Sequence, residues 1–240
     1  MHHAVLDEWS RRESALHRRD PRAKTAALVV FLIVVTTSTH NFVVLGPAYL
    51  GMLVAGMAWA RIPPAGALAR AAVVLPFSLV FAGAVALAGD PQRAVLLAAK
   101  SYVSAAAVLL LVATTPLPAL LRGFEGLGAP RFLLMVAQFL YRYLFVISEE
   151  AQHMRAAALS RGGGIRAGRT RFRAAAGALA VLFARSHVRA SDIHRAMLAR
   201  GFEGHFRLVR NLRFGLADAL FLVPAAGFPL ALRLALGGGV

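Results

Sequence analysis

Two short segments that end in arginine and glycine are the polar feature of this sequence best suited to binding another protein. Residues 157–162 read AALSRG and residues 196–201 read AMLARG, so the pattern A-x-L-[SA]-R-G occurs twice, 39 residues apart. A glycine that follows a helix readily takes the left-handed C-cap conformation. The repeat predicts two helix ends that each present an arginine to a partner. The residues concerned are Ser160, Arg161, Gly162, Ala199, Arg200 and Gly201.

The chemistry of such helix ends rests on the arginine and on the small residues before it. The planar guanidinium forms paired hydrogen bonds with carboxylates or helix-end carbonyls, and alanine and serine allow another surface to approach closely. For either copy alone, the simpler interpretation is that the arginine only complements the helix dipole and the glycine only ends the helix. Because two copies occur on consecutive helices, we favour binding to a partner.

Other polar patterns give no support for catalysis or for a cofactor. Gly163–Thr170 matches the spacing of a phosphate-binding P-loop, but Arg169 replaces the lysine and a helical pattern, not a strand, precedes it. His187 and His194 are seven residues apart, without the second ligand at i+4 that a zinc-binding helix carries. The histidines of Met1-His2-His3 are interpreted as incidental. We predict no catalytic residue and no nucleotide, metal or other cofactor bound by this chain.

The composition places these segments in a membrane protein. Of the 240 residues, 58% are hydrophobic and 16% are charged, whereas soluble domains average about 45–50% and about 25%. A chain of this size cannot bury that excess, so part of it must face lipid. The absence of cysteine excludes disulfides, thiolate zinc sites and cysteine nucleophiles.

Five apolar stretches are long enough to cross a bilayer, which takes about 17–25 helical residues. Within them, Lys100 and Asp218 are the exceptional charges. We interpret both as lying near a membrane interface, and for Asp218 we keep open a pairing across helices that affects motion. The predicted spans are Ala23–Thr39, Phe42–Ala60, Ala71–Ala88, Ala94–Thr115 and Phe214–Leu236.

The distribution of basic residues sets the topology. With a cytoplasmic N-terminus, residues 1–24, 61–70 and 116–213 lie in the cytoplasm and hold 24 of the 27 basic residues. The positive-inside rule describes this asymmetry, so we predict a multi-pass protein of the bacterial cytoplasmic (inner) membrane with its C-terminus outside. The net charge of +16 then belongs mostly to the cytoplasmic face, and no nucleic-acid partner is needed to explain it.

The long basic region between the fourth and fifth spans carries both arginine-glycine segments. Residues 116–213 contain 16 arginines and five acidic residues. Helical patterns cover Pro118–Leu127, Pro130–Ser160 and Thr170–Ala199. We interpret the apolar part of the second helix, Phe132–Ile147, as lying along the cytoplasmic membrane surface. The predicted fold is therefore all-α and membrane-integral, with divisions at 1–115, 116–213 (the cytoplasmic three-helix coupling region) and 214–240.

Nearly the whole chain resembles the transmembrane T component of energy-coupling-factor (ECF) transporters, in its cobalt-type, CbiQ-like form. The residues that carry the resemblance, besides the two repeats, are Leu16–Lys24 (LHRRDPRAK), Val112–Pro116 (VATTP) and Tyr141–Arg155 (YRYLFVISEEAQHMR). In that family, paired Ala-Arg-Gly motifs end two helices that dock onto two cytoplasmic ATPase subunits. The first copy departs from this pattern, since Ser160 replaces alanine; serine is also small, so we carry the role to both copies.

The resemblance implies a non-catalytic scaffold of an ATP-driven importer. Its partners would be two cytoplasmic ATPase subunits, which bind the ATP and Mg²⁺, and a substrate-capturing membrane subunit. Cobalt is the substrate that the resemblance favours, followed by nickel and then a vitamin. Two other classes stay open, a transporter or channel that acts alone and a membrane enzyme that binds an anionic substrate on its basic face. Neither would need ATPase subunits.

Overall fold

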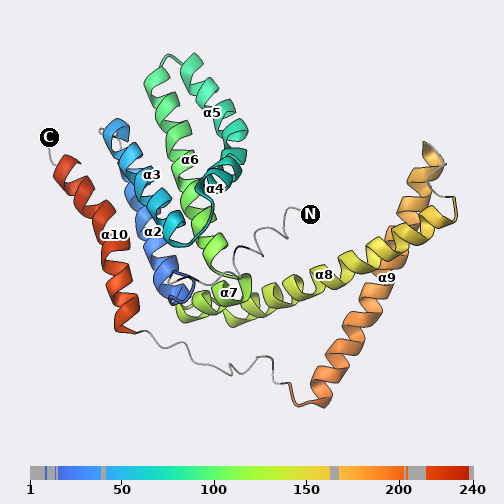
Figure 1. Cartoon of the computed structure of the whole chain (residues 1–240). Helices are drawn as coiled ribbons and strands as arrows, with labels where there is room; N and C mark the ends of the chain where they lie inside the picture. Colours follow the sequence, from blue (N-terminus) through green and yellow to red (C-terminus); the bar gives the residue numbers. More distant parts are fainter. Residues whose placement is uncertain are drawn as a thin grey trace. The chain divides into compact units, whose positions relative to one another are not determined.

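Helices form all the regular structure in the computed structural model, which describes residues 9, 14, 16–38, 42–162, 168–202, 204 and 215–237 (Figure 1). The predicted all-α class is confirmed for these residues. In chain order the elements are α2 (Pro21–Thr37), α3 (Phe42–Trp59), α4 (Pro64–Ala71), the 3-10 turn η1 (Ala72–Val74), α5 (Leu75–Leu87), α6 (Pro91–Thr114), α7 (Leu117–Gly126), α8 (Arg131–Ser160), α9 (Arg169–Ala199) and α10 (Leu216–Gly237).

The chain divides into two compact units. The first comprises residues 1–127 and 211–240, and the second comprises residues 128–210. Helices α2 to α7 and α10 belong to the first unit, and α8 and α9 form the second. The short helix α7, predicted as part of the coupling region, packs on α2 in the first unit.

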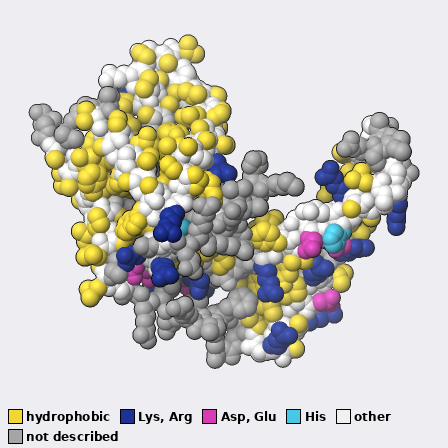
Figure 2. Space-filling model, in the orientation of Figure 1, with side chains coloured by type: hydrophobic (Ala, Val, Ile, Leu, Met, Phe, Trp, Pro, Cys, Tyr) yellow, Lys and Arg dark blue, Asp and Glu magenta, His cyan; other side chains and the backbone are white. Residues whose placement is uncertain are grey.

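The core of the first unit lies among α2, α3 and α6. Phe31 and Tyr49 meet edge to face with their ring centroids 5.6 Å apart, and both are buried. Alanines of α6, including Ala106 and Ala113, are fully buried and allow the neighbouring helices to approach. Outside this core, large apolar side chains such as Phe77 and Leu87 of α5 are exposed. Figure 2 shows apolar side chains over much of the visible surface of this unit, as expected where lipid surrounds the helices.

Among the residues that the structure describes, four helical segments are long and apolar enough to cross a membrane: Pro64–Leu87, Pro91–Thr114, Arg131–Ser160 and Asp218–Ala235. Helix α3 is apolar over the shorter stretch Val44–Trp59. Helix α2 has 17 residues, which is the lower limit for a span. The apolar part of α8, predicted to lie on the membrane surface, thus also has the length and composition of a span. The count of five spans and the cytoplasmic position of α7 to α9 stay predictions.

The third predicted span begins earlier than expected. Its helical path starts at Pro64 and runs through α4, η1 and α5 to Leu87, whereas the sequence prediction began at Ala71. Pro64 occupies the first turn of α4, where its missing N–H needs no partner. The 3-10 turn at Ala72–Val74 lies directly before the turn that contains Pro76, whose ring interferes with regular α-helical bonding to the preceding turn.

The second unit is a hairpin of two long helices. Figure 1 shows α9 folding back from the end of α8. Glu150 of α8 and Arg185 of α9 form an ion pair between them. Most side chains of both helices are exposed, and Leu134 is the buried residue of α8. The two helices therefore leave much of their surface available for partners.

Candidate partner-binding site

The two arginine-glycine segments end α8 and α9 with the same backbone geometry. Arg161 has φ −90° and ψ 17°, and Arg200 has φ −94° and ψ 13°. The glycines that follow, Gly162 and Gly201, have φ of +79° and +75°. This left-handed conformation is unfavourable for residues with a Cβ. The sequence repeat is thus a structural repeat, as predicted.

Hydrogen bonds at the two ends show why the helices stop there. The Gly201 N–H donates to the Leu198 carbonyl at 3.0 Å, and the Phe202 N–H donates to the Met197 carbonyl at 3.1 Å. This pair of bonds is the Schellman motif. At the first copy the Gly162 N–H makes the equivalent bond to the Leu159 carbonyl at 3.0 Å; the following residue lies outside the described part of the chain.

Both arginine side chains are exposed, and within the described part of the chain neither makes a hydrogen bond or an ion pair. Ser160 and Ala199, the small residues before them, are exposed as well. Ser160 Oγ donates to the Ala157 carbonyl of its own helix at 2.9 Å. The hydroxyl is thus bonded within α8, and serine takes up little more of the surface than the alanine of the second copy. Each helix therefore ends in an exposed arginine that follows a small side chain. The guanidinium N–H groups can donate to a partner's carboxylate or to a helix-end carbonyl.

Helix α9 lies between the two arginine-glycine segments in the chain. Arg161 precedes α9 and Arg200 follows it, and α9 has 31 residues. At 1.5 Å per residue the helix is about 46 Å long. Residues 128–210 carry fourteen arginines and four acidic residues, so the unit as a whole attracts acidic surfaces.

An apolar groove runs between α8 and α9 on the side of the hairpin away from its turn. Its volume is about 390 Å³. Met135, Phe139, Tyr143 and Ile147 of α8 line one wall with a spacing of four residues, which places them on one helix face. The other wall comes from Ser186–Met197 of α9, and Phe202 also lines the groove. In the sequence, 132–147 is one apolar surface, and the spacing of four is visible in it, but the groove itself depends on the packing of α9 against α8.

The two exceptional charges of the first unit are held by protein atoms. Lys100 Nζ donates to the Thr36 carbonyl at 2.9 Å and lies 5.6 Å from the centroid of the Phe42 ring. Asp218 Oδ1 accepts from the Asp20 N–H at 3.0 Å, and Oδ2 accepts from the Gly215 N–H at 3.1 Å. Asp218 of α10 therefore contacts the start of α2, as in the alternative kept open for it, and the effect of this contact on motion stays a prediction.

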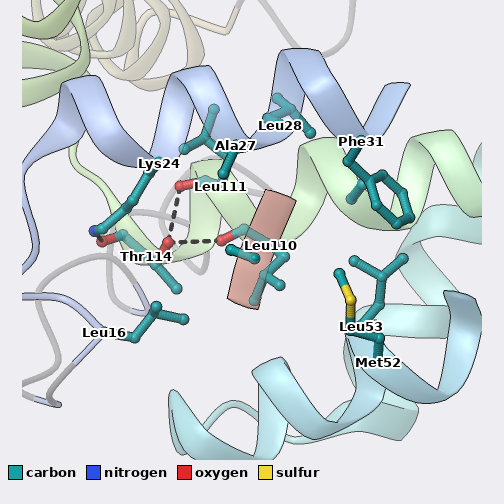
Figure 3. Close-up of a pocket in the computed structure, with 12 residues that line it drawn as sticks. Leu16, Lys24, Ala27, Leu28, Phe31, Met52, Leu53, Leu110, Leu111 and Thr114 are labelled. Carbon is teal, nitrogen blue, oxygen red and sulfur yellow. Dashed lines mark hydrogen bonds between the residues drawn. The ribbon is translucent and has the colours of Figure 1, made fainter. Parts of the chain in front are cut away.

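A buried lysine that the sequence analysis did not select lies in the same region. Lys24 of α2 is 5% exposed, and its Nζ donates to the Thr114 carbonyl and to Thr115 Oγ1, each at 3.0 Å. Figure 3 shows Lys24 and Thr114 together at one end of a cavity of about 90 Å³, whose other end is lined by Phe31, Met52 and Leu53. The contact joins two segments, LHRRDPRAK and VATTP, that carried the family resemblance.

Several predicted features lie outside the described residues. These are His2 and His3, residues 163–167 of the glycine-rich turn, and the arginines at 207, 210 and 213. The described part of that turn, Gly168 with φ +65°, precedes α9. The prediction that this chain binds no cofactor is not tested by the structure and stays a prediction.

Long apolar helices with exposed hydrophobic surfaces, followed by a basic hairpin, define a polytopic α-helical membrane protein. The family model described as "Cobalt transport protein", CbiQ, matches residues 12–209. The energy-coupling factor transporter transmembrane protein EcfT of Acidaminococcus fermentans is 29% identical over 248 aligned residues, covering 90% of each chain. The cobalt transport protein CbiQ of Rhodobacter capsulatus is 30% identical over 169 residues, covering 69% of this chain and 68% of that protein.

The family model covers well over half of the chain, so this protein belongs to the CbiQ family of transporter membrane components. The resemblance to the T component of ECF transporters is thereby confirmed. The names of the family and of its relatives agree with transmembrane transport as the function class. Both arginine-glycine segments lie within the matched residues.

Proposed function

We propose that this chain is the membrane scaffold of an ATP-driven ECF-type importer and that Arg161 and Arg200 each dock one cytoplasmic ATPase subunit. The observation that carries the proposal is the pair of matching helix ends: equal backbone geometry, exposed arginines, and positions at opposite ends of α9. A cap that served only its own helix would not need an uncovered arginine at both ends. When the ATPases close on ATP, two tips held in this way move with them.

The groove between α8 and α9 supports the second part of the proposal, which concerns the substrate-capturing membrane subunit. We assign this subunit to the apolar surface 132–147 and to the groove beside it. The groove is lined mainly by apolar side chains, and such a surface can receive the apolar face of a partner helix. A partner helix there would follow the same movement as the arginine tips. The ATPases and the captured substrate would then be coupled through a single hairpin.

Cobalt ions are the substrate that we propose, because the family model and the Rhodobacter capsulatus relative both carry cobalt transport in their names. Nickel or a vitamin is the alternative within the same mechanism, since the captured substrate contacts another subunit. A transporter that acts alone is the alternative outside it. A nickel or vitamin importer would keep the ATPase partners, whereas a transporter that acts alone would have none.

Purification of the tagged chain from its native host tests the proposal. We expect two P-loop ATPase subunits and a further small membrane protein to co-purify, and the complex to hydrolyse ATP. In proteoliposomes it should take up ⁵⁷Co²⁺ only with ATP on the cytoplasmic side. A chain that transports Co²⁺ without any ATPase subunit would contradict the scaffold function, and ATP-driven uptake of Ni²⁺ but not Co²⁺ would change the substrate alone.

A further inference from the structure

The chain leaves the first unit once, after α7, and returns to it once, before α10. Both connections lead to the α8–α9 hairpin, so they are the covalent routes by which a movement of the hairpin can reach the first unit. The residues that hold α7 and α10 at these points therefore determine how far a movement of the hairpin also moves the membrane helices. Residues Asp20–Lys24, at the start of α2, contact both α7 and α10.

On the side where the chain leaves, Lys24 binds the segment between α6 and α7. Its Nζ donates to the Thr114 carbonyl and to Thr115 Oγ1, each at 3.0 Å, and Thr115 is 2% exposed. Burying an ammonium group is unfavourable unless it is paired and hydrogen-bonded. The two bonds therefore hold Thr115, and with it the start of α7, in one position against α2.

Helix α7 itself lies directly on the same turn of α2. A Cβ placed on Gly123 would be 3.0 Å from Pro21 Cβ and 3.3 Å from the Pro21 carbonyl carbon. A Cβ on Gly126 would overlap the guanidinium of Arg22. At Gly123, where the neighbours are backbone and proline atoms, glycine allows this close approach, so the last turns before the hairpin rest on Pro21 and Arg22.

On the side where the chain returns, Asp218 binds the same turn. Its Oδ1 accepts from the Asp20 N–H at 3.0 Å, while Oδ2 accepts from the Gly215 N–H at 3.1 Å at the start of α10. Asp20 in turn caps α2 by accepting from the Arg22 N–H at 2.8 Å. Lys24 thus holds the side where the chain leaves, and Asp218 holds the side where it returns, both at the start of α2.

We propose that Lys24 and Asp218 are positioning residues for coupling. Together they fasten the start of α7 and the start of α10, the helices that lead to and from the hairpin, to the start of α2, so that displacement of α8 and α9 moves the membrane helices. The inference rests on the proposed function, because only a hairpin driven by ATPases needs such an anchor. Without it, ATP hydrolysis would continue while the connections absorbed the movement.

The other end of α2 provides a matched control. There Lys100 Nζ of α6 donates to the Thr36 carbonyl at 2.9 Å, and Arg233 of α10 donates to Thr37 Oγ1 at 2.6 Å. The same two helices are joined to α2 by the same kind of bond, but no connection to the hairpin passes this end. Lys100→Met is therefore the same chemical change in a lysine of α6 that bonds to α2, without the proposed role.

The experiment measures ⁵⁷Co²⁺ taken up per ATP hydrolysed by the full complex in proteoliposomes. Coupling between sites usually corresponds to about 5- to 150-fold effects. We expect Lys24→Met to lower the uptake-to-hydrolysis ratio by about fivefold or more, and Lys100→Met to leave it within about twofold of wild type. Lower stability alone would reduce the amount of complex, and would not change this ratio. An assembled Lys24→Met complex with the wild-type ratio would overturn the proposal.

If the complex with Lys24→Met does not assemble, two milder variants test the same proposal. Thr115→Val removes one acceptor, and Asp218→Asn keeps an oxygen for the Asp20 N–H but loses the charge; each should lower the ratio in the same direction. Unchanged ratios in both variants would overturn the proposal.

A further set of variants, Arg161→Ala and Arg200→Ala, separates this proposal from the proposed function. If this set loses uptake while the anchor variants keep the wild-type ratio, only the anchor fails. A wild-type complex without ATP-driven uptake of Co²⁺, Ni²⁺ or a vitamin overturns both.

Discussion

Replacing Gly123 by alanine should loosen α7 from α2. The added Cβ would lie 3.0 Å from Pro21 Cβ, 3.3 Å from the Pro21 carbonyl carbon and 3.5 Å from the Arg22 amide nitrogen. Two of these atoms belong to the backbone, and the third belongs to a proline ring. Because none of them can rotate away, α7 itself must shift.

The expected cost follows from two opposing terms. Forcing an extra methyl into a packed site costs about 1–3 kcal/mol, and alanine recovers up to about 1 kcal/mol over glycine in a helix. We therefore expect a net loss of about 1–2 kcal/mol in the free energy of unfolding. For a chain of about 240 residues this lowers the thermal midpoint by about 2–8 °C.

The assay is thermal unfolding of the purified chain in detergent, with Gly83→Ala as the matched control. Gly83 lies inside α5 of the same unit, and a Cβ there meets no atom within 4 Å. This control should keep or slightly raise the wild-type midpoint. If Gly123→Ala unfolds at the same temperature as Gly83→Ala, the close packing of α7 on Pro21 is refuted.

Two further predictions concern topology and the first arginine-glycine segment. Gln92→Cys, the only thiol in a cysteine-free chain and exposed at the start of α6, should react with a membrane-impermeant maleimide from outside the intact cell; labelling only after permeabilisation would reverse the proposed orientation. Ser160→Ala should leave ATPase binding and transport within about twofold of wild type, because Ser160 Oγ bonds to the Ala157 carbonyl of its own helix. A tenfold loss would show that the hydroxyl itself contacts a partner.

The helices could be predicted from the sequence because apolar runs, prolines and glycines mark their bounds. The ends of α8 at Ser160 and of α9 at Ala199 were predicted to the residue, since Gly162 and Gly201 follow each helix and favour the left-handed cap. The start of the third span was wrong by seven residues. Apolarity alone marks where a helix can cross lipid, and it does not show that Pro64 begins the helix earlier in a more polar segment.

The arginines of the candidate site could be predicted from the sequence, but the contacts between distant parts of the chain could not. Arg161 and Arg200 could be selected because their pattern occurs twice. The anchor at Lys24 could not, because its partners Thr114 and Thr115 are about 90 residues away in the chain. A lysine in the first turn of an apolar helix normally extends toward the interface. The burial of Lys24 becomes visible only in the packing of α6 and α10 on α2.

The central claim is that the two arginine tips hold the ATPase subunits, and Arg161→Ala/Arg200→Ala tests it most directly. Losing a forked arginine contact that leaves a partner carboxylate unpaired costs about 2–5 kcal/mol, whereas an exposed arginine that only complements a helix dipole contributes about 0.3–1 kcal/mol. Lysine should restore a dipole effect almost fully and should restore a forked contact poorly.

The measurement is ATPase co-purification and ATP-driven ⁵⁷Co²⁺ uptake for the single alanine, double alanine and double lysine variants, each compared at equal amounts of membrane-inserted chain. We predict that single alanine variants keep part of their ATPase while uptake falls, that the double alanine variant loses both, and that the double lysine variant stays close to it. A double alanine variant with wild-type ATPase content and uptake would contradict the account.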